Sequence, residues 1–148
     1  MPKKELFLKG SLKKIKNRKQ FLEDINNLLG QLSSKESKIC LNDILRILKG
    51  DVEICIVFHK DKIVGMGSIH FTETFIRKVG IIEDVVVDKN YQGKRIGQSI
   101  VEVLINEARK NGVNCIDLTS NPKRVAAVAL YKKLGFKERE TNLYRLEF

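Results

Sequence analysis

The chain of 148 residues is poor in cysteine, and its few cysteines exclude two kinds of small protein. Cys40, Cys55 and Cys115 are an odd number, lie far apart and form no C-x-x-C pair. A disulfide framework and a zinc cluster both need paired or closely spaced cysteines. We therefore expect free thiols, two of them in apolar segments, and no metal site.

Long apolar runs are also missing. No segment approaches the roughly 18 consecutive apolar residues of a membrane helix, and the opening residues 1–5 lack the apolar core of a secretory signal. We expect a cytoplasmic protein without a membrane partner. The length suits one domain over residues 1–148, and a hydrophobic content of 43% places the chain outside the disordered class.

Acidic residues are in deficit: 28 lysines and arginines outnumber 18 aspartates and glutamates, which gives a formal net charge of +10. Such a balance suits a polyanionic partner, either nucleic acid or a ligand that carries phosphates. Much of the excess lies between Lys3 and Lys19, with no interleaved aromatics beyond Phe7 and Phe21. A solvated lysine-rich face is the favoured interpretation over a nucleic-acid site.

Hydrophobic periodicity predicts alternating strands and helices. Strands are expected at residues 6–8, 54–58, 63–71, 81–87 and 113–119, with one or two more in 136–148. Helices are expected over residues 21–30, 42–48, 96–110 and 124–134, with Asn42 as the N-cap of the second and a loop over 31–38. The near-continuous apolar strand 81–87 reads as central, and the strand-helix-strand unit 81–119 implies a locally parallel pair.

A polar loop that bears glycines joins the central strand to the long helix; residues 87–97 read VDKNYQGKRIG. The first backbone N–H groups of a helix lack internal partners and carry the positive end of the helix dipole, so they suit phosphate oxygens. Gly93 and Gly97 permit close approach of a ligand, and Lys94 and Arg95 add charge. Ordinary turns use the same residues, and the two common nucleotide signatures, G-x-x-x-x-G-K-[ST] and G-x-G-x-x-G, are absent.

The stretch from Glu83 to Gly97 resembles the central motif of the GNAT superfamily of N-acetyltransferases. In that motif a strand ending in V-x-P-x-Y is followed by [QR]-x-x-G-x-[GA], and here Gln92 and Gly97 match its ends. Lys89 stands where proline is frequent. Arg95 stands where the family usually has a glycine. Glucosamine-6-phosphate acetyltransferases look similar to this chain in tolerating a larger residue at that position.

A second block, RVAAVALYKKLGF at residues 124–136, resembles the family's N-x-x-A-x-x-[LF]-Y-x-x-x-G-F. Arg124 replaces the asparagine, so Asn121 is expected to contact the pantetheine arm instead. The resemblance is weak before Glu53 and strong after Ile81. It implies an α/β (α+β) GNAT fold: a central mixed, mostly antiparallel sheet with a splayed parallel strand pair, flanked by the four predicted helices.

The resemblance also implies an N-acetyltransferase with acetyl-CoA as co-substrate. In the family the pantetheine arm pairs with backbone groups of the splayed strand, and the loop binds the pyrophosphate. The expected coenzyme-binding residues are Val85, Val86, Val87, Gln92, Gly93, Lys94, Arg95, Ile96, Gly97, Gln98, Asn121, Arg124, Ala127 and Tyr131.

Two residues are candidates for proton transfer. Tyr131 occupies the family's general-acid position, and reference pKa values of about 10 for tyrosine and about 8.5 for a thiol make proton transfer to the leaving sulfur feasible. Glu83, beside Asp84 at the start of the central strand, is the candidate base and is expected to be partly desolvated. Two alternatives remain: water could relay the proton, or Glu83 and Asp84 could be strand-edge carboxylates that only neutralise nearby lysines. Thr119 replaces the glutamate that other members use on the following strand.

Two function classes remain. The first is an enzyme that acetylates a small-molecule or protein amine, and the second is a catalytically silent module of the same fold, for instance a basic nucleic-acid-associated adaptor. The register of Tyr131 with the loop favours the enzyme. The acceptor amine, the identity of the base and a homodimeric state are left open by the residues.

Overall fold

The computed structural model describes residues 2–7, 15–34 and 38–148, with side chains from residue 15 onward and at residues 2 and 3. Five strands form one sheet in the order β1-β2-β3-β4-β5. The strands are β1 (Lys3–Phe7), β2 (Val52–His59), β3 (Lys62–Glu73), β4 (Lys78–Val87) and β5 (Cys115–Asp117). The helices are α1 (Arg18–Leu32), α2 (Leu41–Leu48), α3 (Ile96–Lys110) and α4 (Val125–Lys133), and a 3-10 turn, η2 (Lys89–Tyr91), follows β4.

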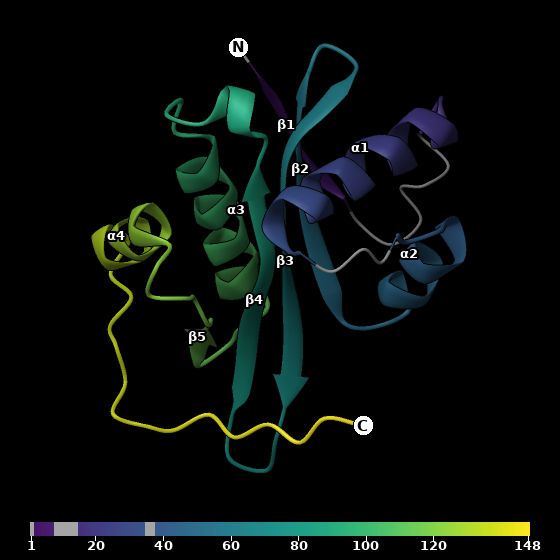
Figure 1. The fold of residues 1–148 in the computed structure, drawn as a ribbon. Coiled ribbons are helices and arrows are strands. Elements are labelled where there is room, and N and C mark those ends of the chain that lie inside the picture. Colours follow the sequence, from purple (N-terminus) through teal and green to yellow (C-terminus); the bar gives the residue numbers. More distant parts are fainter. Residues whose placement is uncertain (1, 8–14, 35–37) are drawn as a thin grey trace.

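The sheet is mixed, as predicted: β1 to β4 pair antiparallel in sequence order, and β5 joins β4 in parallel. Figure 1 shows α1 and α2 on one face and α3 and α4 on the other. Each face has its own apolar core, one built around Leu28 and Ile56 and one around Ile69, Ile100 and Leu104. These five side chains have at most 1% of their surface exposed, so both helical layers are firmly seated.

Helix α3 lies unusually close to the sheet because glycines of β3 face it. A Cβ added to Gly67 would lie 2.7 Å from Cγ2 of Ile100, and one on Gly65 would lie 3.1 Å from Cγ2 of Ile96. Larger residues at either position would push the helix outward. The close packing places the first turn of α3 directly after the end of β4.

The outer edge of β4 is only partly paired. Its parallel ladder with β5 joins Val79, Gly80 and Ile81 to Cys115, Ile116 and Asp117 and ends there. A register shift opposite Met66 and Ser68 of β3, with a left-handed φ of 54° at Asp84, bends the strand just beyond that point. Among the described residues, 82–87 therefore have a strand neighbour on their inner side alone.

Three predictions of local structure are wrong. Helix α2 begins after Cys40 rather than Asn42: Asp43 reaches back to the Cys40 N–H (2.8 Å), and this capping contact fixes the start. The strand predicted at 113–119 shortens to β5, because β4 turns away. Residues 136–148 form no strand, since three-residue β5 offers too little edge for another strand to pair with.

The boundaries of the other elements move by a few residues. Helix α1 runs through Gln31 and Leu32, which were predicted to belong to a loop, and its N-cap is Asn17. Residue 8 of the predicted first strand lies outside the described residues, as do Lys9, Lys13 and Lys14 of the basic N-terminal stretch. No helix among the described residues is both long and apolar enough to cross a membrane.

Candidate active site

The loop after β4 has a backbone shape that most residues avoid. Gly93 has φ 76° and Arg95 has φ 60° with ψ 16°, both in the left-handed region. Glycine adopts that region freely, whereas an arginine there is strained. Arg95 is also the N-cap of α3 and makes no side-chain capping bond. The first N–H groups of α3 therefore face away from the helix without a side-chain acceptor.

The predicted loop residues gather at this turn. Gln92 is exposed and its Nε2 donates to the carbonyl of Val87 (3.2 Å). The Lys94 ammonium lies 5.0 Å from the centroid of the Tyr91 ring, a cation–π distance. Gly97 lies where three elements meet, because a Cβ there would be 3.6 Å from Val87 and 3.7 Å from Leu130 of α4.

The three valines lie on β4 as expected. Val86 is buried under α1, while Val85 and Val87 are partly buried in the core under α3. Their side chains are core residues, so a ligand would contact this stretch through its backbone, along the outer edge that β5 leaves free. The half-exposed Gln98 in the first turn of α3 bonds to Glu102 and receives a bond from Lys133 of α4 (3.1 Å).

Tyr131 lies near the end of α4 with 8% of its surface exposed. Its ring meets the Phe136 ring edge-on at 5.8 Å between centroids. Burial raises the pKa of the Tyr131 phenol, against a smaller opposing effect of the Arg124 charge. The phenol therefore keeps its proton at neutral pH, which a general acid requires.

A cavity of about 550 Å³ adjoins Tyr131. It is lined by the end of β5, by α4 and by the C-terminal segment, with Thr119, Ser120 and Lys132 among the polar residues. The Ser120 hydroxyl is buried and has no hydrogen-bond partner among the described residues. An unsatisfied buried hydroxyl beside a cavity is a feature that a polar ligand would satisfy.

The remaining predicted residues are more exposed. Arg124 and Asn121 lie on the turn before α4, where the Asn121 Oδ1 accepts from the Lys123 N–H (2.9 Å). That bond leaves the Asn121 amide NH₂ as the group available to a ligand. Ala127 is partly buried one turn further along α4.

Glu83 differs from expectation. Its side chain is exposed rather than partly desolvated, because it lies just beyond the last residues that β5 covers. Its carbonyl accepts from the hydroxyl of Ser68 (3.2 Å), which in turn contacts Nε2 of His70 (3.2 Å). A solvated Glu83 can take up a proton directly or through water.

One residue of the loop was missed by sequence reasoning. Asp88, between β4 and η2, is 1% exposed and pairs with Lys62 at 3.0 Å. Burial pushes the pKa of this carboxyl upward, but the hydrogen bond from the Asn90 N–H and the Lys62 charge outweigh burial, so the pKa lies below its ordinary value. The pattern Asp88-x-Asn90 is typical of an Asx turn, and this pattern could have identified Asp88 from the sequence.

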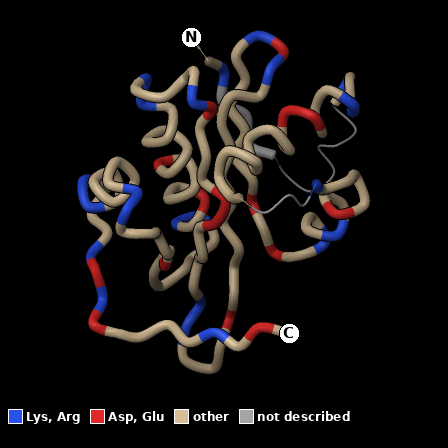
Figure 2. Tube along the Cα trace, in the orientation of Figure 1, with Lys and Arg blue, Asp and Glu red and all other residues tan. Residues whose placement is uncertain are grey.

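Basic residues surround this region. Figure 2 shows lysines and arginines in the loop before α3 and along α4, on the same side of the sheet. A positive surface beside uncapped helix N–H groups favours an anionic ligand. Among the described residues, no group of histidine, cysteine, aspartate and glutamate has the geometry to hold a metal ion.

Residues 20–136 match the family model described as the acetyltransferase (GNAT) family. Two curated relatives are each 29% identical: the glucosamine 6-phosphate N-acetyltransferase of Arabidopsis thaliana, over 85% of this chain and 87% of its own, and the IAA acetyltransferase of Azospirillum brasilense, over 81% and 76%. A crystal structure of a Trypanosoma brucei acetyltransferase superposes with a TM-score of 0.76 at 28% identity, covering 99% of this chain and all of the other.

Proposed function

Since the chain belongs to the acetyltransferase (GNAT) family, we propose that it transfers the acetyl group of acetyl-CoA to a primary amine. The observation that carries this proposal is the loop between β4 and α3. It combines a left-handed backbone at Gly93 and Arg95, a helix start without a side-chain cap and a strand edge that no described strand covers from Ile82 onward. These features suit a ligand that has two phosphates and an extended amide-bearing arm.

The residues present fit coenzyme A. The N–H groups of residues 96–98 would face the pyrophosphate, with Gly93 open around its α-carbon and Lys94 supplying charge. The arm would lie against the backbone of Val85 to Val87, between β4 and α4. The unsatisfied Ser120 hydroxyl in the cavity beside Tyr131 and the Asn121 amide on the turn before α4 would offer further polar contacts.

The proposed chemistry is direct transfer. The amine nitrogen bonds to the acetyl carbon, the carbon–sulfur bond breaks, and Tyr131 donates its phenolic proton to the departing sulfur. An ammonium has no lone pair, so Glu83, or a water molecule that it orients, first takes one proton from the ammonium. The second proton that the nitrogen loses as the amide forms restores the Tyr131 phenol. Burial of Tyr131, which raises its pKa, keeps the donor protonated before each turnover.

The acceptor is a small-molecule or protein amine. A relative 29% identical is named for glucosamine 6-phosphate, and this chain carries a net charge of +10, so amines that also carry phosphate are the first candidates. The cavity beside Tyr131, lined by the end of β5, by α4 and by the C-terminal segment, is the place where the acceptor would approach the thioester.

The test has two steps. Calorimetry with coenzyme A measures binding, and an amine panel that includes glucosamine 6-phosphate, polyamines and lysine peptides, assayed with labelled acetyl-CoA, measures transfer. Binding with transfer supports the enzyme. Binding without transfer to any amine supports a catalytically silent module, whereas a thermal shift with DNA and none with coenzyme A supports a nucleic-acid adaptor.

A further inference from the structure

Asp88 is tied down through every polar group it has. Its carboxylate accepts from Nζ of Lys62 (3.0 Å) and from the backbone N–H of Asn90 (2.9 Å). Its own N–H donates to the carbonyl of Val64 (2.9 Å), and its carbonyl accepts from the N–H of Tyr91 (2.8 Å). One buried residue thus joins the β2–β3 hairpin, the end of β4 and the turn η2.

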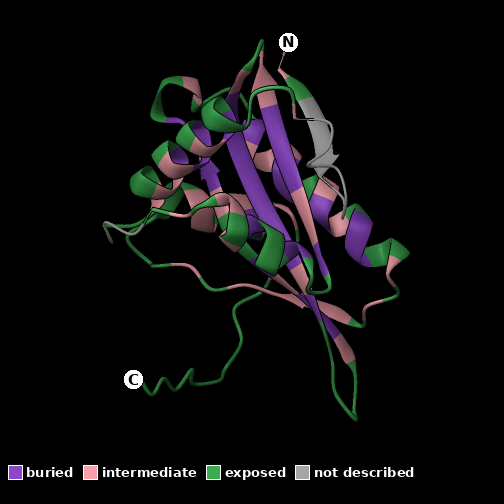
Figure 3. Ribbon diagram, turned by 90° about the vertical axis from the view of Figure 1, so that its right-hand side faces the viewer, coloured by how far each residue is buried: buried purple, intermediate pink, exposed green. Residues whose placement is uncertain are grey.

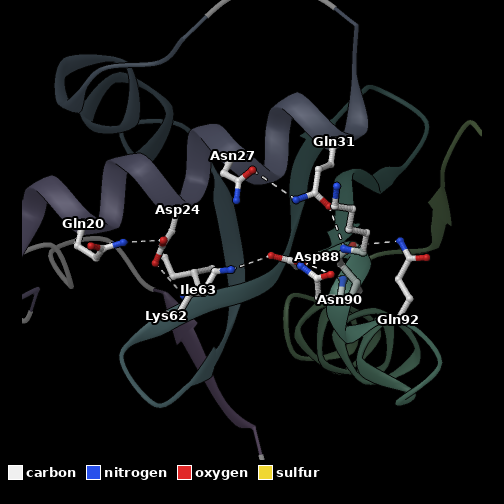
Figure 4. Close-up of polar contacts among 11 residues, drawn as sticks. Gln20, Asp24, Asn27, Gln31, Lys62, Ile63, Asp88, Asn90 and Gln92 are labelled. Atoms are coloured by element: carbon white, nitrogen blue, oxygen red, sulfur yellow. Dashed lines mark hydrogen bonds and ion pairs between the residues drawn. The ribbon is translucent and has the colours of Figure 1, made fainter.

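A second contact braces the same turn from α1. Oε1 of Gln31 accepts from the backbone N–H of Lys89 (2.9 Å), and Nε2 of Gln31 lies 3.4 Å from Oδ1 of Asn27. Next to Lys62, the N–H of Ile63 donates to Asp24 of the same helix (2.9 Å). Figure 4 shows two separate links from α1, one in which Asp24 contacts the backbone beside Lys62 and Lys62 contacts Asp88, and one in which Gln31 contacts the backbone of the turn.

These contacts of Asp88 and Gln31, together called the brace, lie next to a strained part of the loop. Arg95 is held at a left-handed φ that an arginine avoids, and α3 begins there without a side-chain cap. The loop therefore needs support at a fixed point to keep its shape without a ligand. Asp88 and Gln31 supply it at the start of the turn, a few residues before Gly93 and Arg95.

We propose that Asp88 is a positioning residue: with Lys62 and Gln31 it holds the loop in its phosphate-binding shape before the coenzyme arrives. This inference rests on the proposed function. A carboxylate near a pyrophosphate is electrostatically unfavourable for binding. We therefore expect the buried Asp88–Lys62 pair to strengthen coenzyme binding through the shape of the loop by more than the Asp88 charge weakens it.

The two effects have opposite signs, so Asp88→Asn separates them. Calorimetry of coenzyme A should show binding about tenfold weaker, because a charge-assisted bond to Lys62 is lost and the turn loosens. A role through charge alone predicts tighter binding. The binding of S-acetylpantetheine, which lacks the pyrophosphate, should not change. Asp61→Asn, which removes the same charge from the exposed hairpin turn beside Lys62, is the matched control and should leave coenzyme A binding unchanged.

Gln31→Ala tests the same brace without changing charge or burial, since Gln31 is exposed. We expect coenzyme A binding about threefold weaker and faster hydrogen exchange of the amides of residues 89–97 in the free protein. Unchanged or tighter binding in Asp88→Asn, in protein whose circular dichroism is native, would overturn the inference. If the unmodified protein does not bind coenzyme A, the proposed function fails instead, and the two failures are distinguished.

Discussion

The two ends of the opening between β4 and α4 are built differently. At the loop end, the buried Asp88 bonds to the β2–β3 hairpin and to η2, and Gly97 of α3 lies beside both β4 and α4. At the other end, β5 has three residues, and the segment that follows α4 forms no strand. Residues 137–148 of that segment are exposed, in contrast to the largely buried strands of the sheet (Figure 3).

Under the proposed function, this difference would separate the coenzyme from the acceptor amine. A coenzyme is the same molecule in every turnover, so a rigid, preformed loop suits it. The cavity that we propose for the acceptor is lined by exposed residues such as Lys132 and by the C-terminal segment, which impose little shape of their own. We infer that the donor is fixed by the fold and that the acceptor depends on side chains that could change without disturbing it.

The most disruptive test of the rigid end is Gly97→Glu. The new carboxylate would lie among the uncapped N–H groups of α3, where it would occupy the anion site itself. We expect coenzyme A affinity to fall by about a thousandfold or more, measured by calorimetry. Gly97→Ala is the control and should bind normally, because a Cβ makes ordinary contacts of 3.6 and 3.7 Å. If the two variants bound coenzyme A with equal affinity, the pyrophosphate would not bind at this turn.

Tyr131→Phe probes the point where the two ends meet. Loss of the phenolic proton should lower kcat by about a hundredfold while coenzyme A affinity stays unchanged. The rate of transfer to the best amine and a calorimetric titration measure the two quantities. Tyr144→Phe, on the exposed C-terminal segment, is the control and should change neither kcat nor coenzyme A affinity. Full activity of Tyr131→Phe at every pH would show that another group protonates the thiolate.

Acid should remove the stabilisation that Asp88 supplies at the loop end. The pKa of Asp88 is lower in the folded protein than in the unfolded chain, so its stabilising contribution is complete above about pH 3.9 and is lost as pH falls through the folded value. Melting temperatures from pH 7 down to pH 3 should therefore fall more steeply in the unmodified protein than in Asp88→Asn. Parallel curves would mean that Asp88 titrates alike in both states.

Arg95→Gly should relax the loop. Glycine adopts φ 60° without strain, so the free energy of unfolding should rise by about 1 kcal/mol, measured by denaturant titration. Coenzyme affinity should change little, because the lost charge and the relieved strain act in opposite directions. A lower stability would indicate that the arginine side chain holds the loop.

The smallest effect is expected from deleting residues 141–148. Leu143, Tyr144 and Leu146 are 75%, 87% and 78% exposed, so their removal should change the free energy of unfolding by less than about 0.5 kcal/mol. Coenzyme binding should persist, whereas the choice among amines should broaden, since Leu143 lines the cavity beside Tyr131. A loss of several kcal/mol would contradict the exposure of this segment.

The rigid end was largely predictable from sequence. The apolar run 81–87, the loop 87–97 and the periodicity of α3 are local patterns, so strand, turn and helix were found in the right order. Asp88 was missed because its partner Lys62 is 26 positions away and lies in what reads as a plain polar turn. The pairing of β3 with β4 brings these two residues together, and neither segment contains a local sequence pattern that indicates the contact.

The open end was predicted less well. Residues 136–148 contain strand-like alternation, yet a strand needs a partner, and the length of β5 depends on where β4 bends at Asp84. The burial expected for Glu83 failed for the same reason. Cys40 as a helix cap was also missed, since cysteine is not among the usual capping residues and the decisive group is Asp43.

The free outer edge of β4 has a consequence for handling the protein. Among the described residues, no strand pairs with the outer edge of residues 82–87, and such an edge on a valine-rich strand can template the addition of a strand from another molecule, which is how many proteins begin to aggregate. A bound coenzyme lying along that edge would mask it. Concentrated stocks should accordingly remain clear for longer when purified and stored with coenzyme A.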